Sequence, residues 1–209
     1  MDLFDNGPQT LVEDAEGGVR YWPDFLPMDL ARTWFDALRE GCRWESERRP
    51  MYDRVVDVPR LQAWYPLDGL PHALPLGAML ERVQAVASGG YTSVGLNLYR
   101  NGNDSVAMHN DTLDHLVPGQ PLALVSLGGV RRMNIRAKAG GRALGIDLQP
   151  GSLLLMSHAS QLTHEHGIPK TARQVAPRMS AVFRARPDVV RVRDPRRVRV
   201  AAPSPGARA

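Results

Sequence analysis

Residues 93–111 read SVGLNLYRNGNDSVAMHND and join a strand-like segment to a turn and then to a second extended segment. Apolar residues alternate up to Tyr99, RNGND is typical of a turn, and SVAM leads out of it. The stretch ends in His109 and Asp111, whose side chains would share one face of a strand because they are two residues apart. The imidazole and the carboxylate could therefore converge on a metal ion. Such a pair is also common as a histidine beside an acid.

The chain after Gly90 continues as short apolar segments separated by turns such as PGQP, AGGR and QPGS. The predicted strands are SVGLNLY, LALVSL, RMNIRA, LGIDL, SLLLM and RMSAVFR. This spacing indicates an all-β sandwich or jelly roll.

The N-terminal half favours two amphipathic helices. The first is LARTWFDALREG, which has an apolar residue at every fourth position and Asp29 before it as a candidate N-cap. The second is LGAMLERVQAVASGG, which ends at Gly89 and Gly90. The expected fold class is therefore mainly β with flanking helices: a jelly roll, or double-stranded β-helix, with two helices packed on one face.

Length and composition indicate one globular domain, because 209 residues with 43% hydrophobic content can bury a single core. We expect an N-terminal tail over 1–20, the domain over 21–186 and an arginine-rich, disordered tail over 187–209. No apolar run is long enough for a membrane span, and Cys42 is the only cysteine. We expect a soluble, cytoplasmic monomer.

The positive charge is concentrated at the C-terminus. From residue 185 onward, seven arginines face two aspartates, a net of +5, whereas the whole chain carries +4, so the remainder carries −1. A nearly neutral body does not by itself indicate a nucleic-acid partner, and the tail is a candidate phosphate-binding arm.

The late segments add residues that suit a metal site. GSLLLMSHASQLTHEHGIPK precedes APRMSAVFRAR, so a histidine, Arg178 and Arg184 follow one another on late strands. A His-x-Asp pair and a distal histidine form the facial triad of non-haem Fe(II) oxygenases, and arginine pairs bidentately with a carboxylate cosubstrate. His164 and His166 both remain candidates for the third ligand.

Four segments together resemble the AlkB family of Fe(II)- and 2-oxoglutarate-dependent dioxygenases, in particular its branch that repairs alkylated nucleobases. These segments are PRLQAWY, NLYRNGNDSVAMHND, HGIPK and PRMSAVFR. The resemblance implies Fe(II), 2-oxoglutarate and O₂ as cofactors, with His109, Asp111 and His166 as metal ligands and His164 as the rival third ligand. It also implies that Asn97, Tyr99, Arg178, Ser180 and Arg184 bind 2-oxoglutarate.

By the same resemblance, the substrate would be an N-alkylated base, such as 1-methyladenine or 3-methylcytosine, in single- or double-stranded DNA or RNA. Tyr65, Asp114 and His164 would contact it, while Trp34 and Trp64 are expected in the core. Ser180 and Val182 stand where the family pattern has Asn and Thr, and Leu113 stands in a usually acidic stretch. These departures leave open an alternative substrate, namely a protein side chain or a small molecule.

Overall fold

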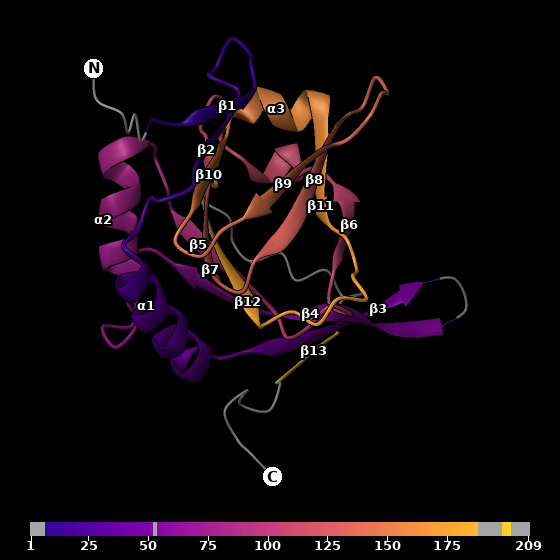
Figure 1. Ribbon diagram of the computed structural model, residues 1–209. Helices are drawn as coiled ribbons and strands as arrows, with labels where there is room; N and C mark the ends of the chain where they lie inside the picture. Colours follow the sequence, from indigo (N-terminus) through magenta and orange to yellow (C-terminus); the bar gives the residue numbers. More distant parts are fainter. Residues whose placement is uncertain (1–6, 52–53, 188–197, 202–209) are drawn as a thin grey trace.

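The computed structural model describes residues 7–51, 54–187 and 198–201, and these form two facing sheets with helices outside the larger one (Figure 1). The larger sheet has the strand order β1-β2-β10-β7-β12-β5-β4-β3-β13 among these residues, and the smaller has β6-β11-β8-β9. Their bounds are β1 Gln9–Val12, β2 Val19–Trp22, β3 Glu45–Met51, β4 Arg54–Pro66, β5 Ser93–Tyr99, β6 Val106–His109, β7 Leu122–Gly128, β8 Arg131–Ala137, β9 Leu144–Leu148, β10 Leu153–Met156, β11 His164–Ile168, β12 Arg178–Arg184 and β13 Val198–Ala201. The predicted jelly roll is confirmed.

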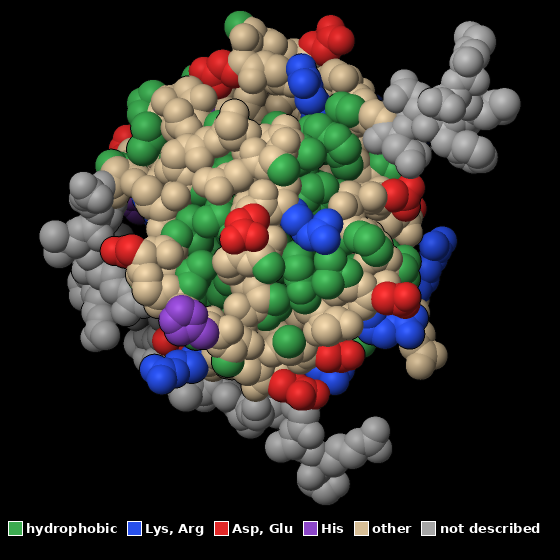
Figure 2. Space-filling view, turned by 90° about the vertical axis from the view of Figure 1, so that its left-hand side faces the viewer, with side chains coloured by type: hydrophobic (Ala, Val, Ile, Leu, Met, Phe, Trp, Pro, Cys, Tyr) green, Lys and Arg blue, Asp and Glu red, His purple; other side chains and the backbone are tan. Residues whose placement is uncertain are grey.

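Two long helices cover the outer face of the larger sheet, as predicted. They are α1 (Met28–Gly41) and α2 (Leu76–Val86). Pro27 occupies the N-cap position of α1, so the prediction of Asp29 as the cap is wrong, and Asp29 lies in the first turn. Its carboxylate there still faces the positive end of the helix dipole. The solvent side of these helices is a mosaic of apolar side chains broken by separate acidic and basic ones (Figure 2).

Two apolar clusters fill the layers. The helix-side core lies between α1, α2 and the larger sheet, and it includes Leu38, Met79, Leu96, Val125 and Phe183. The inter-sheet core lies between the two sheets, and it includes Leu124, Met133, Ile135, Ile168 and Val182. Because side chains alternate along a strand, every strand in the middle of the larger sheet contributes to both sides.

This alternation decides which residues face the space between the sheets. On β12, Met179, Ala181 and Phe183 enter the helix-side core, so Arg178, Ser180, Val182 and Arg184 face the other way. The same parity on β5 turns Asn97 and Tyr99 toward the smaller sheet. We refer to this side of the larger sheet as the inner face.

The six predicted segments after Gly90 form β5, β7, β8, β9, β10 and β12, whereas the strands of the N-terminal half and β13 were not predicted. β3 and β4 form a hairpin, and the sequence of β3, ESERRPM, lacks apolar alternation. Three further elements are short: α3 (His158–Thr163), the 3₁₀ turn η1 (Leu113–His115) and β13. No described helix has both the length and the apolar content that a membrane span requires.

Part of the predicted C-terminal tail is ordered. Residues 198–201 form β13 and pair with β3, which differs from the expected disorder at these four positions. Arg186 belongs to the domain, because its backbone N–H donates to the Thr92 hydroxyl oxygen and its carbonyl oxygen accepts a hydrogen bond from the same hydroxyl. The other tail arginines, apart from Arg199 in β13, lie outside the described residues.

Candidate metal centre

Three potential metal ligands meet between the sheets. His109 ends β6, Asp111 follows two residues later, and His166 lies in the middle of β11. Antiparallel pairing places His166 directly opposite His109, and their ring centroids are 4.6 Å apart. One ligand atom from each of the three residues lies within 4.8 Å of the others. Two imidazoles and one carboxylate on one side of a point are the donor set of a facial-triad metal site.

Arg184 keeps the carboxylate of this group ionised. Its Nε donates to Asp111 Oδ2 and its Nη2 donates to Asp111 Oδ1 at 3.2 Å. Burial alone would raise the pKa of Asp111, but the charge and hydrogen bonds of Arg184, together with the two histidines, lower it to about 2. Asp111 is therefore an anion at neutral pH, the form that binds a cation.

Burial holds the His166 imidazole in its neutral form. Desolvation and the neighbouring His109 lower the pKa of His166 to about 4, although Asp111 partly opposes them. A neutral imidazole has a free lone pair for a metal ion.

Two hydrogen bonds orient the other ligands. His109 Nδ1 lies 2.8 Å from the Ala107 carbonyl oxygen, which can only accept, so Nδ1 carries the hydrogen and Nε2 keeps its lone pair. The backbone N–H of Asp111 donates to Gln161 Oε1 at 3.1 Å, which fixes Asp111 to the end of α3.

A buried guanidinium lies on the inner face of β12. Arg178 is 1% exposed, and burial lowers its pKa to about 10, so it remains charged at neutral pH. Its Nη2 donates to Ser126 Oγ at 2.8 Å, while its Nε and Nη1 have no hydrogen-bond partner within the described part of the chain. Its guanidinium carbon lies 5.2 Å from the Tyr99 ring centroid. Two unpaired donors on a buried cation fit a carboxylate ligand, whose two oxygens match the guanidinium fork.

A row of polar residues crosses the inner face beside Arg178. Ser126, Ser180, Asn97 and Gln62 are direct neighbours on β7, β12, β5 and β4. The row provides hydroxyl and amide groups in an otherwise apolar layer, which suits a polar ligand held by a few placed groups. Val182, where the resemblance expected Thr, packs in the inter-sheet core.

Comparison with known proteins agrees with this geometry. A family model described as the 2OG-Fe(II) oxygenase superfamily matches residues 18–200. Alpha-ketoglutarate-dependent dioxygenase alkB homolog 3 from Bos taurus is 29% identical over 182 residues, covering 78% of this chain and 64% of that protein. The Homo sapiens homolog 3 is 28% identical over 209 residues, covering 85% and 73%. The chain belongs to the AlkB family.

Another relative is the DNA oxidative demethylase ALKBH2 from Homo sapiens, which is 32% identical over 157 residues. That match covers 66% of this chain and 60% of that protein. The AlkB-family chain thus spans less than two thirds of the length of two of these three relatives. The cofactors of the superfamily are Fe(II), 2-oxoglutarate and O₂, and the His-Asp-His group and Arg178 fit them.

The other histidines of this AlkB-family chain lie outside the ligand group. His164 Nδ1 lies 2.8 Å from Thr163 Oγ1, and His164 is not among the three residues whose ligand atoms converge. The register explains the difference, because His166 pairs with His109 whereas His164 pairs only with Ala137. His158 starts α3 and His115 ends η1, and neither belongs to the converging group.

The placement predicted for two aromatic residues of β4 is wrong. Tyr65 packs against the helix-side core and its hydroxyl accepts a hydrogen bond from the Arg43 backbone N–H at 3.1 Å. Burial raises the pKa of Tyr65 to about 12. Trp64, which was expected in the core, has the opposite parity and lies on the inner face beside Gly95. The signal was present in the sequence, since Leu61, Ala63 and Tyr65 form one apolar alternating row.

The remaining predicted substrate residue, Asp114, lies in η1 with an exposed side chain. It follows the ligand Asp111 by three residues but is not part of the converging group. The structure therefore places it at the surface near the site.

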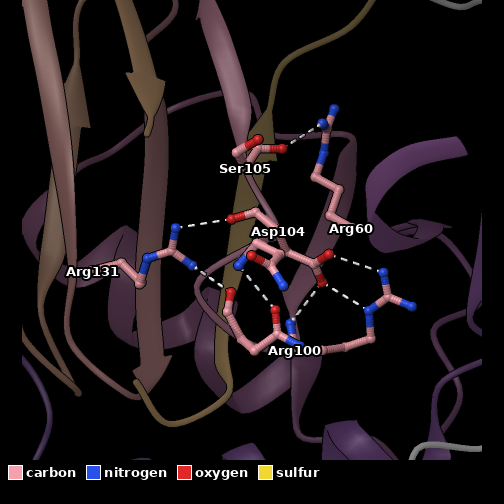
Figure 3. A network of polar contacts seen from close by, with 7 residues as sticks. Arg60, Arg100, Asp104, Ser105 and Arg131 are labelled. Atoms are coloured by element: carbon pink, nitrogen blue, oxygen red, sulfur yellow. Dashed lines mark hydrogen bonds and ion pairs between the residues drawn. The ribbon is translucent and has the colours of Figure 1, made fainter. Parts of the chain in front are cut away.

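A network that sequence reasoning missed holds the turn before β6 (Figure 3). Arg131 is 3% exposed and donates to the carbonyl oxygens of Asn101 at 3.0 Å, Asp104 at 2.9 Å and Pro169 at 2.7 Å. The Asp104 carboxylate in turn accepts two hydrogen bonds from the Arg100 guanidinium. The network therefore joins the turn that leads to His109 with the segment that follows His166. No sequence pattern marked Arg131.

Proposed function

We propose that this AlkB-family chain removes alkyl groups from the nitrogen atoms of bases in DNA or RNA, using Fe(II), 2-oxoglutarate and O₂. The main support is the position of the potential metal ligands His109, Asp111 and His166. They lie in the same inter-sheet space as the unpaired donors of Arg178. The relatives' names, a dioxygenase and a DNA oxidative demethylase, support the substrate class.

We assign His109, Asp111 and His166 to Fe(II). Arg178 and Tyr99 would hold the distal carboxylate of 2-oxoglutarate, while Asn97, Ser180 and Arg184 would line the end nearer the metal. With its cofactors bound, such a centre supplies the hydroxylation of an N-methyl carbon, after which the base sheds formaldehyde and succinate is the co-product. The protein's own contribution is to keep Asp111 charged and the His166 imidazole neutral.

The base would leave its stack to reach the site, which is easiest for a methylated base that cannot pair. Trp64 replaces Tyr65 as the stacking candidate, because Trp64 is the β4 aromatic on the inner face. 1-Methyladenine and 3-methylcytosine are the proposed lesions. We also propose that the enzyme works as a cytoplasmic monomer, on single- or double-stranded nucleic acid.

A second candidate function is hydroxylation of a protein side chain or a small molecule. Leu113 in place of an acidic residue, and a net charge of −1 outside the C-terminal 25 residues, favour it. Leu113 cannot form the hydrogen bonds with a base that an acidic side chain would form. A negative net charge outside the C-terminal segment gives little long-range attraction to phosphates.

The test is succinate formation by the purified chain with Fe(II) and 2-oxoglutarate. It compares a single-stranded DNA containing 3-methylcytosine, the same sequence in RNA, the unmethylated DNA and no polymer. Stimulation by a methylated polymer together with formaldehyde release is expected, and Asp111→Ala should abolish both. Equal succinate in all four arms would favour the second candidate.

A further inference from the structure

The amide of Asn97 is held by two residues of the neighbouring strand β4. Asn97 Oδ1 accepts a hydrogen bond from Arg60 Nε at 2.8 Å and another from Gln62 Nε2 at 3.1 Å. Gln62 is the direct register partner of Asn97, so both contacts come from the side of the sheet away from β12. The amide oxygen thus has both of its acceptor positions filled.

These contacts decide which way the amide points. An arginine side chain has donors and no acceptor, so Arg60 can bond only the oxygen of the Asn97 amide. If the Asn97 amide were rotated by 180°, its NH₂ group would lie opposite the Nε–H of Arg60, and two donors cannot form a hydrogen bond. The Asn97 NH₂ group is therefore directed away from Arg60 and Gln62, and it can face the ligand space between the sheets.

Arg60 is itself anchored at a second point. Its Nη1 donates to the Ser105 carbonyl oxygen at 3.3 Å, and Figure 3 shows this guanidinium reaching the turn. Ser105 immediately precedes β6, whose last residue is His109. The Arg60 side chain therefore joins Asn97 to the segment that carries a proposed metal ligand.

The side-chain amide of Gln62 has only part of its hydrogen-bonding capacity satisfied in the described part of the chain. Its Oε1 is buried and has no hydrogen-bond partner among the described residues, while its NH₂ group serves Asn97. A buried, unsatisfied acceptor lowers stability, so this orientation is not the one that hydrogen bonding of Gln62 alone would select.

We propose that Arg60 and Gln62 are positioning residues that fix the Asn97 amide so that its NH₂ group donates to 2-oxoglutarate. This inference rests on the proposed function, because it requires 2-oxoglutarate in the inter-sheet space. Neither residue needs to touch the cosubstrate. Gln62 acts through Asn97, and that dependence can be measured.

The test is a double-mutant cycle on the binding of 2-oxoglutarate to the full chain loaded with Mn(II), which prevents turnover. The variants are Gln62→Met, Asn97→Ala and the double variant, and Gln62→Met changes no charge. Gln84→Met, at an exposed position on α2, is the matched control. Gln62→Leu replaces Gln62→Met if the latter does not fold.

Asn97→Ala is expected to weaken 2-oxoglutarate binding about tenfold, the value of one hydrogen bond to a charged group. Gln62→Met should weaken it by about three- to tenfold, and the double variant should be no weaker than Asn97→Ala, because contacts in one network are not additive. The Kd for Mn(II) should stay unchanged in all variants. In the Fe(II) enzyme, Gln62→Met should raise KM for 2-oxoglutarate and leave kcat at saturation unchanged.

Four results would overturn the inference. An unchanged Kd in Gln62→Met, or losses that multiply in the double variant, would show that Gln62 does not act through Asn97. A Gln62→Met variant that loses Mn(II) affinity or kcat in the same proportion would indicate a structural role. Absence of 2-oxoglutarate binding by the unmodified chain would overturn the proposed function together with this inference, whereas the other results leave the proposed function standing.

Discussion

At the scale of single residues, His109, Asp111 and His166 are set apart by ligand atoms that converge on one point, a group that the described residues form between the sheets. We predict that His109→Ala, Asp111→Ala or His166→Ala abolishes Fe(II)-dependent 2-oxoglutarate decarboxylation, because two ligands cannot hold the ion in a fixed geometry. His164→Ala is the control and should retain turnover. If His164→Ala were inactive and His166→Ala active, His164 and not His166 would be the third metal ligand.

The distal carboxylate site makes a second prediction. Arg178→Lys should raise KM for 2-oxoglutarate by about tenfold or more, because a compact ammonium cannot reproduce the bidentate fork. Steady-state kinetics with varied 2-oxoglutarate measures it. An unchanged KM would place the distal carboxylate elsewhere.

The lowered pKa of His166 predicts how stability depends on pH. The ordinary pKa of histidine is 6.5, and that of His166 in the folded chain is about 4. At a pH between these two values, His166 is protonated in the unfolded chain and neutral in the folded one. The unfolded state therefore binds more protons, so the unfolding free energy should fall as the pH falls through this window. Urea unfolding of the chelator-treated chain should show this slope, and His166→Gln should flatten it. An equal effect of His158→Gln would contradict the assignment.

At the scale of elements, register and parity determine what the strands contribute. The network around Arg131 joins the start of β8 to the turns on either side of the two ligand strands (Figure 3). We predict that Arg131→Met lowers the unfolding free energy by about 2–4 kcal/mol, because buried carbonyl groups lose their donors. Arg132→Met is the matched control, since the neighbouring Arg132 is exposed and forms a surface ion pair with Asp147. It should change stability by less than about 1 kcal/mol. Equal losses would show that the network does not stabilise the fold.

At the scale of the whole molecule, the question is where attraction to a nucleic acid would arise. The domain is nearly neutral. Arg186, which the charge count from residue 185 onward includes, belongs to the domain, because its backbone N–H donates to the Thr92 hydroxyl. We predict that replacing Arg191, Arg193, Arg196 and Arg197 by Gln makes the slope of log affinity against log salt shallower by about 2–3 for a methylated single strand. Decarboxylation without nucleic acid should not change, and β13 keeps its sequence. Parallel slopes would exclude the tail as a phosphate-binding arm.

The sequence by itself determined six of the strands after Gly90, the two helices, and the order of His109, Asp111, Arg178 and Arg184 along the chain. These features are local: apolar periodicity and turn residues act within a few positions. The family followed from a resemblance in four segments, namely PRLQAWY, NLYRNGNDSVAMHND, HGIPK and PRMSAVFR. The comparisons show the same family.

Only the tertiary structure decided which histidine faces His109, which β4 aromatic lies on the inner face, and how β3 and β4 extend the larger sheet. These depend on strand register, and a shift of one residue exchanges the two faces of a strand. It also revealed Arg131, Gln161 and the pair that orients Asn97, because hydrogen bonds between residues far apart in the chain leave no local pattern in the sequence.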